Sequence, residues 1–240
     1  TNNDVSIWVD AASAAKSVID LNVYTLENNY SNVVNNFTSN ELIFERRQGN
    51  SNDFERINFP VGFEGGNTGT CPTQNLVDAY EMQSNGLAIS DPASGYDPTN
   101  PYSGRDPRLQ QTVIVNGSNW KGQTVESFIG GANGKPITNA TKTGYYLKKY
   151  VIEAINLSPT NTTSREHTWV LFRYGEILLN YAEAMNEAYG PENGATFGLT
   201  ALDAVNQVRQ RVNMPNFPAG LSQSEFREKL RNERMIELAF

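Results

Sequence analysis

Residues 169–212 carry the clearest hydrophobic pattern in the chain. In their first part, polar residues recur at steps of three and four and so form one stripe along a helix. The members of this stripe are Arg173, Glu176, Asn180, Glu183 and Glu187. The other positions form two apolar seams, one containing Leu178 and the other Ile177, as in a helix packed on two sides. We therefore predict a helix that begins at Trp169 and ends at the Gly- and Pro-containing loop 190–194.

A second helix is predicted after this loop. Its apolar face consists of Ala201, Val205, Val208 and Val212. Pro215 prevents the helix from continuing far past Asn213. Two antiparallel helices joined in this way cannot bury both of their faces alone, so they must stack on further hairpins, as tetratricopeptide-like repeats do. The pattern thus predicts a mainly α fold built from helical hairpins.

Shorter patterns predict the elements that precede this hairpin. Residues 5–19 have apolar positions at helical spacing, so we predict a helix that ends near Asn22. One or two helical turns are expected in residues 30–37. Leu42, Ile43 and Phe44 are apolar neighbours that favour a short strand.

Residues 48–144 have a different composition from the flanking segments. Gly, Asn and Pro are frequent there, which indicates loops. A helix over residues 75–82 and a strand over residues 113–115 interrupt these loops in our prediction. A long loop-rich insertion on a rigid scaffold is where binding residues tend to lie.

Together these patterns predict tetratricopeptide-like helical hairpins, forming an alpha-alpha superhelix, with a loop-rich insertion that contains short strands. We expect three regions along the chain. Residues 1–47 would be a helical repeat remnant, residues 48–150 the insertion and candidate binding region, and residues 151–240 a helical hairpin with the start of the next repeat.

Several separated runs of residues carry a family resemblance. They are PTQNLVDAYEMQSNG (72–86), SGRDPRLQQTV (103–113), YYLKKYV (145–151), RYGEILLNYAEAMNE (173–187), ALDAVNQVRQRVNMP (201–215) and LRNERMIELAF (230–240). In this order they resemble the SusD/RagB family of glycan-binding outer-membrane lipoproteins. Several motifs in family order are more specific than a single short pattern, and the resemblance spans nearly the whole chain.

The resemblance implies a non-catalytic protein that binds oligosaccharide or polysaccharide at the bacterial cell surface. It implies delivery of the glycan to a TonB-dependent outer-membrane transporter, and attachment to the outer membrane through a lipid anchor. The chain starts without a signal peptide and ends inside a predicted helix, so we expect an internal fragment of such a lipoprotein. Cys71 lies mid-chain and is not the anchor residue. No cofactor is expected.

Charge and composition narrow the possible partners. The chain has 26 acidic and 19 basic residues, a net charge of −7. Phosphate binding needs clustered Lys and Arg, so this balance argues against a nucleic-acid partner. A hydrophobic content of 38% is typical of a folded chain. No apolar run reaches the roughly 18 residues that cross a bilayer, so any membrane contact would come through the anchor.

Aromatic residues of the insertion are the candidate glycan contacts. A sugar presents C–H faces that stack on aromatic rings and hydroxyls that bond to amide or guanidinium groups. Trp120 follows Asn119 in a loop of Asn, Gly and Ser, whereas Tyr96 and Tyr102 lie in Gly/Pro/Asp-rich loops near Arg105. We predict that Trp120 is an exposed stacking platform and that the other four residues contribute to binding. The alternative is that Trp120 fills a small core beneath the insertion, because Trp is highly buried on average.

The other two tryptophans are expected in the core. Trp8 and Trp169 fall on the seams of the predicted helices. Neither is therefore a candidate for sugar stacking.

Catalysis has weak support in the sequence. The single histidine, His167, lies in a polar stretch just before the predicted helix and is expected at the helix entry or facing solvent. Glu176 and Glu183 share a helix face, but residues seven apart stand about 10 Å apart along a helix. An ion-paired stripe explains them better than the paired carboxylates of glycoside hydrolysis.

Metal binding is supported no better. One His and one Cys provide none of the usual zinc spacings. Asp91, Asp97 and Asp106 could help to hold calcium, but their spacing matches no known calcium loop.

A second function stays open. In this alternative the chain is a helical-repeat scaffold that binds other proteins and does not bind glycan directly. The insertion then serves as a cap or docking surface.

Overall fold

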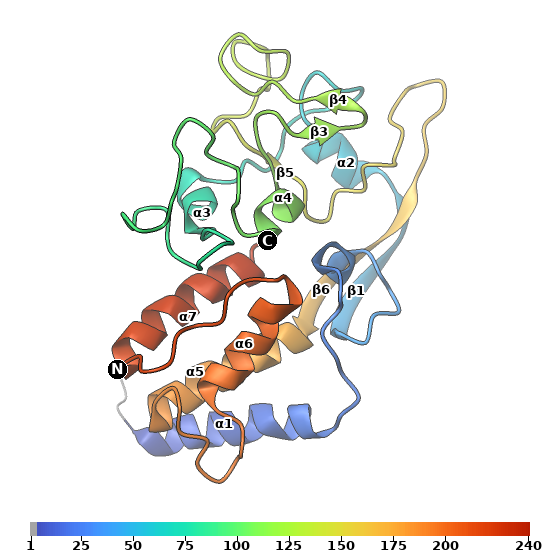
Figure 1. Cartoon of the computed structure of the whole chain (residues 1–240). Helices are drawn as coiled ribbons and strands as arrows, with labels where there is room; N and C mark the ends of the chain where they lie inside the picture. Colours follow the sequence, from blue (N-terminus) through green and yellow to red (C-terminus); the bar gives the residue numbers. More distant parts are fainter. Residues whose placement is uncertain (1–3) are drawn as a thin grey trace.

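The structure is a computed structural model and describes residues 4–240. Within this range the chain forms seven α-helices, one 3-10 helix and six β-strands. Four of the strands are only two residues long, and they form two separate two-stranded ladders. Figure 1 shows a helical layer on one side, a loop-rich half on the other and a two-stranded ribbon that runs between them. Regular structure is therefore mainly helical.

The helical layer contains α1 (Val5–Asp20), α5 (Tyr174–Tyr189), α6 (Ala201–Arg211) and α7 (Gln223–Glu237). Local sequence specifies three of the starts. Asp4 accepts a hydrogen bond from the Ser6 N–H at the start of α1, and α6 and α7 each begin with a capping box, led by Thr200 and Ser222. These caps satisfy N–H groups that a helix start leaves free. The helices predicted over residues 5–19 and 201–212 are confirmed.

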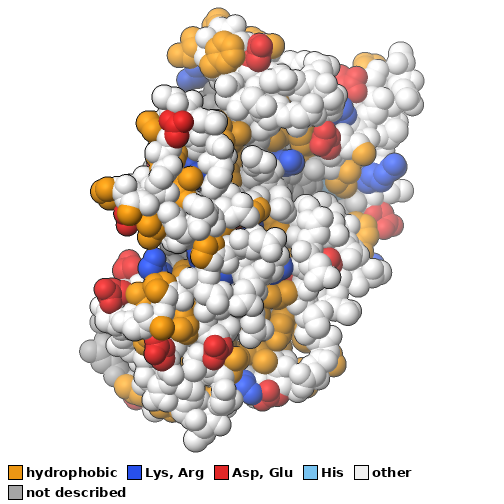
Figure 2. All heavy atoms as spheres, viewed as in Figure 1, with side chains coloured by type: hydrophobic (Ala, Val, Ile, Leu, Met, Phe, Trp, Pro, Cys, Tyr) orange, Lys and Arg blue, Asp and Glu red, His pale blue; other side chains and the backbone are white. Residues whose placement is uncertain are grey.

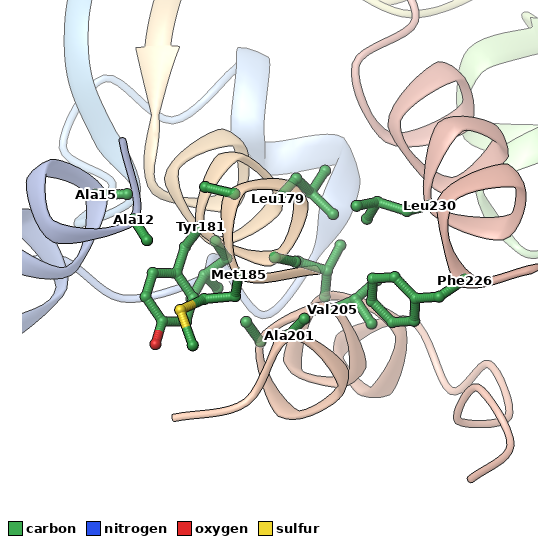
Figure 3. Close-up of a cluster of buried hydrophobic side chains, with 14 of the residues drawn as sticks. Ala12, Ala15, Leu179, Tyr181, Met185, Ala201, Val205, Phe226 and Leu230 are labelled. Atoms are coloured by element: carbon green, nitrogen blue, oxygen red, sulfur yellow. The ribbon is translucent and has the colours of Figure 1, made fainter. Parts of the chain in front are cut away.

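Helix α5 is the centre of this layer, because it contacts α1, α6 and α7. Figure 3 shows the apolar side chains that fill the space between these helices. The labelled ones are Ala12, Ala15, Leu179, Tyr181, Met185, Ala201, Val205, Phe226 and Leu230. A helix with neighbours on several sides needs more than one apolar seam, as predicted for residues 177–188.

The start of this helix was predicted wrongly. Residues Arg165–Arg173 form strand β6, which pairs antiparallel with β1 (Leu42–Ser51), and the helix begins only at Tyr174. The segment TWVLFR is rich in β-branched and aromatic residues, which favour strands, and a partner strand far back in the chain completes its hydrogen bonds. Trp169 and Leu171 consequently lie on an exposed ribbon instead of in a core seam.

Strand β1 is longer than the short strand predicted at residues 42–44. Its outer half, ERRQGN, is mostly polar and exposed, so hydrophobicity does not reveal it. The ladder with β6 includes bulges, one of which lies between the pairs Phe44–Phe172 and Glu45–Val170.

The loop-rich half carries the remaining short elements. They are η1 (Tyr30–Val34), α2 (Asp53–Asn58), α3 (Gln74–Ala79), α4 (Arg108–Thr112), β2 (Val113–Ile114), β3 (Asn119–Trp120), β4 (Gln123–Thr124) and β5 (Tyr146–Leu147). Strand β2 pairs with β5, and β3 pairs with β4. The helix predicted over residues 75–82 and the strand predicted over residues 113–115 correspond to α3 and β2, both shorter than expected.

Trp120 is buried at the centre of this half. Its side chain is 0% exposed and meets the Phe59 ring edge to face, with ring centroids 5.7 Å apart. Ile114, Tyr146 and Ile155 belong to the same apolar cluster. The prediction that Trp120 is an exposed stacking platform is therefore wrong. Segments with little regular structure still need a close-packed interior, and the indole is one of the large side chains that fill it.

A network of buried ion pairs joins the helical layer to the loop-rich half. Glu237, the last residue of α7, accepts hydrogen bonds from Arg173 at 2.6 Å, from Arg211 at 2.5 Å and from Arg108 at 2.8 Å. Glu233, one turn earlier, accepts from Arg108 at 2.5 Å and from Arg209 at 2.6 Å. Residues of α4, α6, α7 and the end of β6 are thus tied together.

The network continues on both sides of these residues. Glu41 accepts hydrogen bonds from Arg173 and Arg211, Glu81 accepts from Arg209, and Asp106 accepts from Arg108. Burial alone would raise the pKa of the Glu237 carboxyl, but three arginines hold it well below its ordinary value. Glu237 therefore stays ionised as the common acceptor of the network.

Lys149 lies against the same network. Its ammonium nitrogen donates to the Tyr30 hydroxyl at 3.0 Å and to the Ala239 carbonyl at 2.7 Å. Burial, together with the nearby positive charge of Arg173, lowers the pKa of Lys149 to about 7.

None of the helices in residues 4–240 combines the length and apolarity that crossing a membrane requires. The three regions predicted from the sequence stay a prediction.

We expect Glu237→Gln to lower the free energy of unfolding by about 3–5 kcal/mol, because it leaves buried arginines without their shared carboxylate. Urea denaturation at pH 7 measures this. Glu228→Gln is the matched control on the same helix, since its partner Arg231 and Glu228 itself are both solvent-exposed, and it should cost about 0–1 kcal/mol. Equal losses in the two variants would contradict a structural role for the network.

The pH dependence of stability should report Lys149. Between pH 7 and the ordinary lysine pKa of 10.5 the unfolded chain binds a proton that the folded chain does not, so this residue makes stability rise with pH. The free energy of unfolding of the wild type should rise by about 2 kcal/mol relative to that of Lys149→Met between pH 7 and pH 9. Urea denaturation of both proteins at the two pH values checks this, and a constant difference would contradict it.

Trp120→Ala should destabilise the protein by about 3–5 kcal/mol, because it empties a fully buried site in the loop-rich core. Trp120→Phe keeps much of the volume and should cost less. Thermal unfolding followed by circular dichroism compares the variants. A melting temperature unchanged by Trp120→Ala would mean that the indole does not hold this core together.

Candidate functional site

A cavity of about 660 Å³ lies beside one face of the β1–β6 ribbon. Its volume is within the range of about 300–1,000 Å³ that is common for small-molecule sites. The ribbon, helix α2 and Tyr150 form its walls. The lining residues are Arg46, Gln48, Ser51, Asp53, Phe54, Ile57, Tyr150, His167, Thr168, Trp169 and Leu171.

Trp169 is the main aromatic surface of the cavity. Its ring stacks on Tyr150, with centroids 4.6 Å apart and an interplanar angle of 17°, and Phe54 approaches it edge-on at 6.1 Å. The side chain nevertheless remains 45% exposed. The indole is thus held in one orientation by two aromatic neighbours while part of its surface stays accessible.

Tyr150 is the buried ring on which Trp169 stacks. It is buried, and its backbone adopts φ = 69°, a left-handed conformation that is uncommon for a residue other than glycine. Such conformations persist where the surrounding structure holds them in place, and they are frequent at binding sites. Burial also raises the pKa of the Tyr150 phenol, which therefore keeps its proton.

The strand register places polar groups around the aromatic surface. Arg46 lies opposite Trp169, and Gln48 lies opposite His167. Cross-strand partners point to the same face of a sheet, so their side chains lie next to each other. Asp53 enters the cavity wall from α2.

His167 connects the ribbon to α2. Its Nε2 atom lies 3.0 Å from both carboxylate oxygens of Glu55, and its Nδ1 atom lies 3.0 Å from the Arg165 carbonyl oxygen. Glu55 also accepts the Ile152 N–H at 3.0 Å. His167 lies within β6 instead of at a helix entry, and both ring nitrogens are engaged. The residue acts as a structural link and is poorly suited to be a general base.

The structure brings two of the residues predicted to bind glycan together, Tyr96 and Arg105, but the Arg105 guanidinium is turned to protein partners. The Arg105 guanidinium is buried and donates to the carbonyl oxygens of Tyr80, Val77 and Pro101. Its central carbon lies 5.5 Å from the centroid of the half-buried Tyr96 ring. Each of its three nitrogens already donates within the protein, which argues against a contact with ligand. A glycan contact by Arg105 stays a prediction.

Tyr102 and Asn119 have different surroundings. Tyr102 packs edge-on against Tyr145 with ring centroids 6.3 Å apart and is half-buried. Asn119 is exposed on β3 beside the buried Trp120, which belongs to a separate apolar cluster. Glycan contacts by Tyr96, Tyr102 and Asn119 stay a prediction.

The sequence interpretation missed Trp169 because it assigned residue 169 to a helix. The signal that could have found it is the composition of TWVLF, a short run of β-branched, aromatic and other apolar residues that is typical of a strand. The side of the ribbon to which Trp169 points is visible only in the structure.

Other chemistries find little support in the described residues. Glu183 lies 3.6 Å from the guanidinium of Arg234, which fits an ion-paired stripe. Asp106, one of the possible calcium ligands, pairs instead with Arg108. Within residues 4–240 there is no group of three or more His, Cys, Asp or Glu side chains arranged to hold a metal ion. On the face drawn in Figure 2, basic side chains are scattered among acidic ones and form no continuous basic patch.

Three aromatic rings held against one another, with amide, guanidinium and carboxylate groups at their edge, can bind a sugar. The ring face of Trp169 can stack on C–H groups, and the polar side chains can exchange hydrogen bonds with hydroxyls.

Comparison with known proteins identifies the family. The SusD family model matches residues 40–240. A SusD-like protein from Bacteroides fragilis has a similar structure, with 27% sequence identity and a TM-score of 0.77, over 99% of this chain and 49% of that one. A SusD-like carbohydrate binding protein from the same species gives 27% identity and a TM-score of 0.78, over 97% and 46% of the two chains.

A more distant structure shows the same fold. The surface glycan-binding protein A from Bacteroides uniformis is 19% identical, with a TM-score of 0.62, over 98% of this chain and 44% of that chain. The present chain thus spans about half the length of the solved structures that it matches. Curated proteins provide no match. The family model covers most of the chain and the structures agree along its length, so this chain belongs to the SusD family.

Proposed function

We propose that this protein binds oligosaccharide or polysaccharide without catalysis, and that the cavity beside the β1–β6 ribbon is its glycan site. The observation that carries the proposal is the half-exposed Trp169, stacked on Tyr150 and flanked by Arg46 and Gln48. A platform that is already rigid loses little conformational freedom when a ligand binds, which favours affinity.

Family membership supports the ligand class. Two similar structures are described as a carbohydrate binding protein and a surface glycan-binding protein. The absence of a catalytic role is part of the proposal. It agrees with the environment of His167, which is tied to Glu55 and to a backbone carbonyl.

We further propose the biological setting that the family resemblance implies. The protein would act at the outer membrane as part of a surface lipoprotein and deliver glycan to a TonB-dependent transporter. Its helices would stack as tetratricopeptide-like hairpins, with α5 and α6 forming one hairpin. The packing of α5 against three other helices supports such stacking.

A protein-binding scaffold is the second candidate function. The observation that favours it is the loop that carries Phe128, Ile129 and Ile137, all exposed, with Ile129 84% accessible. Exposed apolar groups of this kind often mark protein contacts. Co-purification with a transporter by a protein that retains no glycan would favour this function over glycan binding.

Trp169→Ala should reduce glycan retention in affinity electrophoresis over a panel of polysaccharides. Loss of one stacking surface corresponds to about 1–3 kcal/mol, or roughly 5- to 150-fold in affinity. Phe44→Ala is the matched control, because Phe44 is an exposed aromatic residue of the same ribbon that does not line the cavity. Circular dichroism should show both variants folded. Equal retention of every polysaccharide by the wild type and Trp169→Ala would refute the site.

A further inference from the structure

Arg46 differs from Arg47 and Arg173 of the same ribbon. It is exposed, lines the cavity and lies opposite Trp169 in the ladder. Arg47 is held by the Glu45 carboxylate at 2.5 Å and by the Phe37 carbonyl, and Arg173 is held by Glu41 and Glu237. Among the residues that the structure describes, no carboxylate lies within ion-pair distance of Arg46. The cavity therefore has a guanidinium that is available to a ligand.

From this geometry we propose that the cavity is specific for acidic glycans, and that Arg46 binds the carboxylate of a uronic acid residue stacked on Trp169. The assignment rests on the proposed function, because it names the sugar class that the same site accepts. A guanidinium presents its donors in a planar fork that matches a carboxylate through two parallel hydrogen bonds. A neutral sugar has no group that makes the same contact.

The position of Arg46 relative to Trp169 suits this role. Directly opposed residues of an antiparallel pair have Cβ atoms about 4.5–5.5 Å apart. The substituents of a pyranose ring that lies on the indole face are then within reach of the Arg46 guanidinium. In a uronic acid the carboxylate is attached directly to the ring, so stacking and ion pairing can occur together.

The remaining polar groups complement such a sugar. Asp53 accepts a hydrogen bond from the Ser51 hydroxyl at 2.9 Å and has further acceptor capacity for sugar hydroxyls. Its negative charge disfavours a carboxylate at the α2 wall and so directs that group toward Arg46. Gln48 adds an amide next to His167. The site thus provides one cation for the carboxylate and acceptors for the hydroxyls.

Local charge also differs from that of the whole chain. Acidic residues outnumber basic ones overall, with 26 against 19. Residues 42–58 contain as many arginines as acids, and residues 165–173 contain more arginines than acids. The arginines around the ribbon therefore offset locally the repulsion between the negatively charged chain and an anionic glycan.

The test compares charged and neutral forms of the same polymers. Polygalacturonate and its methyl ester, and alginate and its propylene glycol ester, are the probes in affinity electrophoresis. The wild type should retain at least one of the charged polymers about 10-fold more strongly than its ester, and this preference should weaken as NaCl rises from 50 to 500 mM. Arg46→Gln should abolish the preference, and Arg46→Lys should restore part of it.

Arg47→Gln is the matched control, because it removes the same charge from the neighbouring position, whose side chain is not part of the cavity wall. It should leave the preference for charged polymers unchanged. Equal loss of the preference in Arg46→Gln and Arg47→Gln would mean that only the general field of the ribbon is involved, and would overturn the assignment.

The two proposals fail in different ways. Retention that depends on Trp169 but is the same for charged and esterified polymers would overturn the acidic-glycan assignment and leave glycan binding intact. Failure to retain any polymer, charged or neutral, including the polysaccharide panel used for Trp169, would refute glycan binding itself and the assignment with it.

Discussion

The carboxylate of Glu237 is the contact on which the architecture depends. It lies at the end of α7 and is shared by Arg108, Arg173 and Arg211, which come from α4, the end of β6 and the end of α6. Charges removed from water are tolerated only when their partners are in place with good geometry. The network therefore allows few relative positions of the helical layer and the loop-rich half. It adds charge pairing to the apolar contacts that also join them, such as the packing of Ile236 in α7 against Val77 and Leu109.

This network also sets the geometry of the candidate site. Arg173 is the last residue of β6, so its pairing with Glu41 and Glu237 fixes where the ribbon leaves the helical layer. Lys149 contacts the Tyr30 hydroxyl and the Ala239 carbonyl, and the next residue, Tyr150, is the one on which Trp169 stacks. The His167–Glu55 pair then brings α2 against the ribbon. Buried polar contacts thus orient an exposed aromatic surface, which is the arrangement that a binding site needs to keep its shape without ligand.

Much of the helical layer could be predicted from local pattern, and the candidate site could not. The faces of α1, α5 and α6 follow from apolar spacing, and the caps at Thr200 and Ser222 follow from residues three positions apart. The family motifs were equally readable. For two tryptophans, however, the structure shows the reverse of what we expected. Trp120, in a loop of Asn, Gly and Ser, is buried, and Trp169, beside a strong helical pattern, is exposed. Flanking polarity describes only the neighbours in sequence, whereas burial depends on all neighbours in space.

What the sequence alone determined is the set of properties that arise within a few turns of chain: helix faces, helix caps, the loop-rich composition of the insertion and the motifs of the SusD family. What the tertiary structure alone decided is which distant segments meet. The strand character of residues 165–173 depends on hydrogen bonds to β1, more than a hundred residues earlier, and the availability of Arg46 depends on which carboxylates lie near it. Backbone pairs and charge pairs across such separations form only in the folded chain. They cannot be read from the sequence, because local propensity carries no information about the partner.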